Sequence, residues 1–187
     1  MNTPDCIKTR RSVRVFQDTP IPRQTMEQIV ALASYAPSWK NTQVARYLVV
    51  DRREEIQAIA QTYATFNSRI LSTCTALVAL TALKHRSGYE RDGSFSTDRG
   101  DGWTMFDCGI AAQTFCLAAQ ELGVGTVILG IFDRAGLQAY LQIPQDRELV
   151  ALIAAGYPGE EPNAPKRKPV EELLSYWDGS VTADQPQ

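Results

Sequence analysis

The chain has 187 residues, a formal net charge of −2, and 44% hydrophobic residues. This size and apolar content predict a single domain, 1–187, in which we expect 178–187 to be a flexible tail. The near-neutral charge argues against nucleic acid as a partner. The N-terminus does not read as a secretory signal and no apolar run could span a bilayer, so we expect a cytoplasmic protein with no membrane partner.

The first notable segment is KTRRSVRVF, residues 8–16, which contains four cationic side chains. If this segment is extended, Arg10, Ser12 and Arg14 project from one face, because alternate residues of a strand share a side. Two guanidinium groups and a hydroxyl would suit a phosphate monoester. The residues alone fit a solvated basic stretch equally well.

Residues 23–36 are predicted to form a helix that Pro37 ends, since Met26, Ile29, Val30 and Ala33 follow helical spacing. The next residues, APSWKNTQ (36–43), combine amide and hydroxyl groups that could meet the edge of a heterocycle, or form an ordinary turn.

A strand is predicted at 46–50, and a helix after it, with Asp51 and Glu54 as a capping box. Residues 75–83 read as a buried strand. The polar stretch 84–102 is predicted to be a long loop. It contains His85, the single histidine, and there is no G-x-S-x-G motif, so a bound cofactor is the better candidate for any chemistry.

Residues 106–122 are apolar nearly all round, which predicts a helix buried centrally or against a partner subunit. A glycine-bounded apolar run at 124–132, a helix from Asp133 through Leu141 and a strand at 149–158 follow. The alternation of helices and strands gives an α/β or α+β class. The four cysteines form no C-x-x-C pair, which favours reduced thiols and no metal site.

A second basic cluster, Lys166, Arg167 and Lys168, lies between two prolines that stiffen it. It could close on the same anion as the first basic stretch, or be a solvated loop. A short helix is predicted over 170–177.

Taken in order, five motifs resemble the nitroreductase family of FMN-dependent, NAD(P)H-oxidising enzymes. They are R-R-S-x-R-x-F, P-I, A-P-S-x-x-N-x-Q, L-G in the second half, and G-Y-P-x-x-x-P followed by K-R-K-P. The resemblance runs from about residue 8 to residue 176. It implies an α+β nitroreductase fold, a mixed central sheet flanked by helices, in an intertwined homodimer with FMN at the interface.

The resemblance also implies which residues bind FMN. Arg10, Arg11, Ser12 and Arg14 match the motif for the phosphate, the ribityl chain and the pyrimidine edge, and Lys166, Arg167 and Lys168 match the rest of the phosphate clamp. Pro37, Ser38, Trp39 and Asn41 match the segment that reaches the flavin of the other subunit. Ile128, Leu129 and Gly130 match the stretch along the ring, with the Gly130 N–H at flavin N5. Asn67 matches a ring-edge amide.

The implied activity is a ping-pong transfer of reducing equivalents from NAD(P)H through flavin N5 to a nitroaromatic, a quinone or another small acceptor. No catalytic side chain and no metal are expected. Trp39, Leu129 and the Val-Ala-Arg after Gln43 depart from common family patterns, which leaves the substrate open. The alternatives are a flavin-binding module without turnover and a member with flavin-consuming or dehalogenating chemistry.

Overall fold

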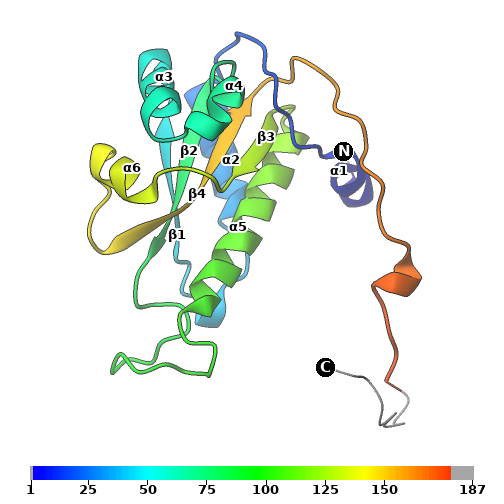
Figure 1. Cartoon of the computed structure of the whole chain (residues 1–187). Helices are drawn as coiled ribbons and strands as arrows, with labels where there is room; N and C mark the ends of the chain where they lie inside the picture. Colours follow the sequence, from blue (N-terminus) through cyan, green and yellow to red (C-terminus); the bar gives the residue numbers. More distant parts are fainter. Residues whose placement is uncertain (1, 178–187) are drawn as a thin grey trace.

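The computed structural model describes residues 2–177 as a four-stranded sheet between two layers of helices (Figure 1). The strands are β1 (Ala45–Val50), β2 (Ala76–Leu83), β3 (Gly125–Leu129) and β4 (Arg147–Gly156). Their order is β1-β2-β4-β3, which leaves β1 and β3 at the edges. The strands predicted at 46–50, 75–83 and 149–158 are confirmed, with ends shifted by a few residues, and the apolar run at 124–132 contains β3. The predicted tail, 178–187, lies outside the described residues.

The ladders between these strands are all antiparallel. The α+β class is confirmed. A mixed sheet was expected, whereas among the described residues the four strands pair only antiparallel. Parallel pairing is limited to an isolated bridge between Ser12 and Thr126. The reason is that the first basic stretch docks beside β3 at this point and does not form a full strand.

The helices divide between the two faces of the sheet. Helix α2 (Arg23–Ala33) and helix α5 (Gly102–Glu121) pack on one face. Helices α3 (Arg53–Thr62), α4 (Ser68–Leu71) and α6 (Arg134–Tyr140) cover the other. A further helix, α1 (Thr3–Thr9), lies near the C-terminal end of α5 (Figure 1).

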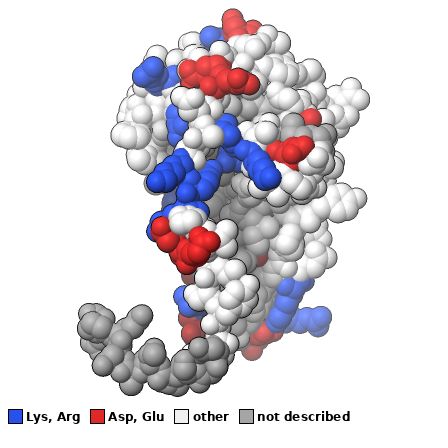
Figure 2. Space-filling model, turned by 90° about the vertical axis from the view of Figure 1, so that its right-hand side faces the viewer, with Lys and Arg blue, Asp and Glu red and all other residues white. Residues whose placement is uncertain are grey.

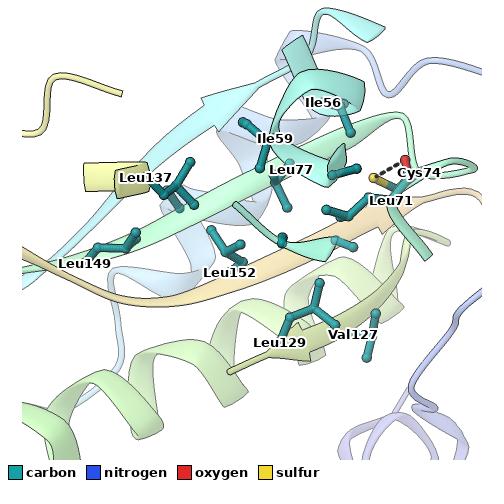
Figure 3. Close-up of a cluster of buried hydrophobic side chains, with 14 of the residues drawn as sticks. Ile56, Ile59, Leu71, Cys74, Leu77, Val127, Leu129, Leu137, Leu149 and Leu152 are labelled. Carbon is teal, nitrogen blue, oxygen red and sulfur yellow. Dashed lines mark hydrogen bonds between the residues drawn. The ribbon is translucent and has the colours of Figure 1, made fainter. Parts of the chain in front are cut away.

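Alternation along the strands supplies both hydrophobic cores. In β2, Leu77 and Ala79 face α3, α4 and α6, whereas Val78 and Leu80 face α2 and α5. Figure 3 shows the first of these cores, with Ile56 and Ile59 of α3 above the sheet and Leu137 of α6 beside them. The two cores cover the sheet from both sides, and β3 forms one of its edges.

Several predicted element ends need correction. The capping box at Asp51 does not form, because Asp51 accepts hydrogen bonds from the Arg23 guanidinium at 3.0 and 3.1 Å. The helix predicted over 170–177 is reduced to a single 3-10 turn, Val170–Glu172, since this segment has no described surface to pack on. Helix α1 was not predicted, although Asn2 caps it by accepting from the Asp5 N–H.

Candidate functional site

The first basic stretch leaves α1 and crosses the start of β3. The Val13 N–H donates to the Thr126 carbonyl at 3.0 Å, and Val13 is buried. A Cβ added to Gly125 would lie 2.7 Å from a methyl carbon of Val13, so only glycine permits this close approach. The predicted extended conformation of the stretch therefore has a structural cause at β3.

The arginines of this stretch line a hollow of about 320 Å³, which we call the basic hollow. Its lining residues are Arg10, Arg11, Ser12, Arg14, Pro162, Asn163, Pro165 and Arg167. The chain that follows β4 runs alongside the chain that follows α1 (Figure 1), and Figure 2 shows Lys and Arg side chains gathered on this face. The two basic clusters, far apart in sequence, thus meet around one cavity.

No carboxylate lines the basic hollow. The hydrogen bonds of its guanidinium groups are to backbone carbonyls: Arg11 donates to the carbonyl oxygen of Lys8 at 2.6 Å and Arg14 to that of Ser12 at 3.2 Å. Among residues 2–177, none of the four arginines of the hollow forms an ion pair with a carboxylate. Their charge is therefore left for an anion from outside the chain.

The second basic cluster is divided between two hollows. Arg167 lines the basic hollow, whereas Lys166 and Lys168 line a neighbouring one of about 520 Å³, to which Arg167 also contributes. The Lys168 ammonium lies 3.2 Å from a Glu172 oxygen. Of the three predicted residues of the second basic cluster, only Arg167 lines the basic hollow in this conformation.

The second predicted segment, residues 37–43, forms what we call the amide loop. Pro37 and Ser38 line a largely apolar hollow of about 300 Å³ between α2, β1 and α5. The Ser38 hydroxyl accepts from the Gln43 N–H at 2.9 Å. Residues Lys40, Asn41 and Gln43 have φ angles of +44°, +54° and +48°, a left-handed conformation that non-glycine residues seldom adopt.

Asp107 of α5 holds the amide loop and was not predicted from the sequence. Its side chain is 3% exposed and accepts from the Trp39 N–H, at 3.0 Å to one oxygen and 3.1 Å to the other. The Ser87 hydroxyl also donates to it, at 2.7 Å. The available signal was a carboxylate in the first half of a largely apolar helix, whose other acidic residue, Glu121, is its last.

The long loop predicted at 84–102 folds back on itself beside the amide loop. A bridge joins Tyr89 to Phe95, and the Lys40 ammonium lies 2.7 Å from a Glu90 oxygen. The rings of Trp39 and Trp103 have centroids 4.6 Å apart at 43°. Indole rings from the amide loop and from the start of α5 thus form one aromatic wall.

The end of β3 presents a different surface. Ile128 is exposed, whereas the Leu129 side chain is 5% exposed and points into the core (Figure 3). A Cβ added to Gly130 would meet nothing within 4 Å, so the space beside its backbone is open. Because the Leu129 side chain lies in the core, only the Leu129 backbone could contact a flavin ring as predicted.

Asn67 lies close to this edge and is buried. Its side-chain amide donates to the Ile131 carbonyl at 2.7 Å. This bond ties the 3-10 turn Thr65–Asn67 to the residue that follows Gly130. The observed contact of Asn67 thus fixes the backbone beside the open edge.

Within one chain the two regions lie toward opposite ends of α5. The basic hollow lies beside the start of β3, just after the helix ends, while Asp107 holds the amide loop near its beginning (Figure 1). With a rise of 1.5 Å per residue, the helix from 107 to 121 is about 21 Å long. A ligand of ordinary size would not reach both regions in one copy.

A sequence model of the nitroreductase family matches residues 7–78 and 61–157. The chain belongs to the nitroreductase family. A relative from Archaeoglobus fulgidus, with the provisional name NADH dehydrogenase/NAD(P)H nitroreductase, is 31% identical over 164 residues, which cover 84% of this chain and 87% of the relative. The family assignment made from the sequence is confirmed.

Solved nitroreductases share the fold. One from Exiguobacterium sibiricum, also provisionally named and solved with FMN, has a TM-score of 0.83 at 20% identity and covers 95% of this chain and 98% of its own. Another from Desulfovibrio desulfuricans, again solved with FMN, has a TM-score of 0.74 at 26% identity and covers 100% and 99%. These names and complexes agree with the predicted cofactors.

The described residues hold neither a metal-binding cluster nor a membrane-spanning helix. Within 2–177, no group of three or more His, Cys, Asp and Glu side chains is arranged to hold a metal ion. In the same range, no helix has the length and apolar character needed to cross a membrane.

Proposed function

We propose that this nitroreductase binds FMN and passes reducing equivalents from NAD(P)H to a small electron acceptor. The observation that carries the proposal is the basic hollow, in which Arg10, Arg11, Arg14 and Arg167 are left without a carboxylate partner among the described residues. A phosphate monoester with two negative charges matches this set of donors. The hydroxyl of Ser12 adds a further hydrogen-bonding group.

The rest of the cofactor would extend from the basic hollow along the open edge of β3. Ile128 is exposed there and the space beside Gly130 is free, so a flat ring could approach the backbone closely. When bound, FMN supplies the hydride chemistry. The chain then has to bind the ring, orient it and limit access of water, which requires no acidic or basic side chain.

We infer that the site is completed by a second copy of the chain. Helix α5 exposes Met105 (47%) and Phe106 (60%), which are costly to leave in water. A two-fold axis across this face would run the two helices in opposite directions. The amide loop of one copy would then come close to the basic hollow of the other.

The segment after β4 supports the same assembly. Residues 159–177 extend from the body (Figure 1), and several large apolar side chains on them are exposed. These are Val170, Leu173, Leu174, Tyr176 and Trp177. A second copy of the chain offers the surface that would cover them.

The proposed acceptor is small and flat, such as a nitroaromatic or a quinone. The aromatic wall of Trp39 and Trp103 supports this choice, because rings stack favourably on indole faces. We place the protein in the cytoplasm, where its four unpaired cysteines would stay reduced.

The proposal is tested by titrating the cofactor-free protein with FMN and with riboflavin, which lacks the phosphate. We expect FMN to bind at least ~100-fold more tightly, since the phosphate makes several charge-assisted hydrogen bonds worth about 1.5–3 kcal/mol each. Quenching of flavin fluorescence measures both affinities. Equal affinities for the two ligands would contradict a phosphate-binding role for the basic hollow.

A further inference from the structure

Asp107 connects three parts of the molecule. It lies on α5 and is almost fully buried, and it accepts from the Trp39 N–H of the amide loop and from the Ser87 hydroxyl of the 84–102 loop. Removing a charge from water is costly unless donors surround it. Within residues 2–177 Asp107 takes part in no ion pair, so these hydrogen-bond donors are the groups that compensate for its burial.

The amide loop depends on contacts from outside the loop to keep its conformation. Lys40, Asn41 and Gln43 all have left-handed φ angles, and such conformations persist only where surrounding contacts enforce them. The bond from Trp39 to Asp107 lies directly before these residues. The Ser38 hydroxyl, which accepts from the Gln43 N–H, holds the loop at its other end.

The 84–102 loop is held at the same place. The Thr104 hydroxyl donates to the Ser87 carbonyl at 3.4 Å, and the Ser96 N–H donates to the Gly88 carbonyl at 2.8 Å. A Cβ on Gly88 would lie 2.2 Å from the Gly100 oxygen, so the loop closes tightly here. Ser87 therefore presents its hydroxyl to Asp107 from a well-fixed backbone.

We propose that Asp107 is a positioning residue that holds the amide loop in the strained conformation in which residues 37–41 meet FMN. The inference rests on the function proposed above and deepens it, since it names the group that shapes this half of the site. Asp107 acts through the backbone of Trp39 and does not touch the cofactor. Through Ser87 it also fixes the 84–102 loop against the amide loop.

The test is Asp107→Ala, compared with Thr104→Val. The alanine has no acceptor, so the Trp39 N–H and the Ser87 hydroxyl both lose the partner that they share in the wild-type protein. Thr104 is buried on the same helix and contacts the 84–102 loop, but it has no described bond to the amide loop. The Thr104→Val substitution therefore removes a buried hydroxyl group but leaves the hydrogen bond from Trp39 to Asp107 in place.

Two measurements are made on each protein: the FMN dissociation constant, and amide hydrogen exchange of the peptide that contains Trp39, without cofactor. For Asp107→Ala we expect at least tenfold weaker FMN binding and at least tenfold faster exchange. For Thr104→Val we expect changes within twofold in both. If Asp107→Ala does not fold, Asp107→Glu, which keeps a carboxylate but displaces it, is expected to change both quantities in the same direction.

Equal effects of the Asp107 and Thr104 variants on both quantities would overturn the inference and leave the proposed function standing. A wild-type protein that binds no FMN would instead contradict the proposed function. In that case, amide hydrogen exchange of the peptide that contains Trp39 would still show whether Asp107 holds the amide loop.

Discussion

Replacing both Arg10 and Arg14 by alanine is expected to weaken FMN binding by roughly 10²- to 10⁴-fold. Each arginine would lose a charge-assisted hydrogen bond worth about 1.5–3 kcal/mol, and every 1.4 kcal/mol is about a factor of ten. Both side chains line the basic hollow. Fluorescence titration of the cofactor-free variant measures the loss.

The matched control replaces Lys8 and Arg23 by alanine, which removes the same charge from the chain. Lys8 belongs to the same basic stretch but does not line the basic hollow, and Arg23 pairs with Asp51 on the surface. We expect this control to bind FMN within about threefold of wild type, because exposed ion pairs contribute only about 0–1 kcal/mol. An equal loss in both variants would show that net charge matters and that the hollow does not.

Replacing Phe106 by glutamate is expected to dissociate the proposed dimer and to reduce FMN binding with it. A two-fold interface carries every substitution twice, so two carboxylates would enter one apolar surface. Burying unpaired charge costs on the order of 3 kcal/mol or more, which corresponds to at least ~100-fold in the dimer dissociation constant. Sedimentation velocity at several protein concentrations gives that constant.

Leu48→Glu serves as the control for this prediction. Leu48 is a partly exposed side chain on β1, at the edge of the sheet opposite β3. The same charge placed there is expected to leave the dimer intact. A Phe106→Glu protein that remains dimeric and retains FMN would exclude α5 as the shared interface.

The strands that are buried on both faces could be predicted from the sequence pattern alone. The apolar stretches that became β2 and β4 have both faces covered by helices, so a continuous hydrophobic sequence was sufficient to identify them. The arginines of the first basic stretch could also be predicted to converge, because an extended segment puts alternate residues on one side.

The remaining features depend on tertiary contacts that sequence spacing does not reveal. Asp51 pairs with Arg23 across 28 residues, and this competes with its expected capping role. The inward direction of Leu129 follows from the register of β3 against β4, in which it lies opposite Leu152. Asp107 was missed because its partners, Trp39 and Ser87, come from two distant loops.

The measurement that tests the proposed function most directly is the visible spectrum of the FMN-loaded protein under anaerobic conditions, before and after stoichiometric NADH or NADPH. We expect the flavin absorption near the visible maximum to be lost on adding a nicotinamide and to return when a quinone is added. If the flavin is reduced while it stays bound at the arginines of the basic hollow, then the FMN held there is the one that turns over. A flavin spectrum that persists with both nicotinamides would contradict the account and would instead indicate a flavin-binding module without turnover.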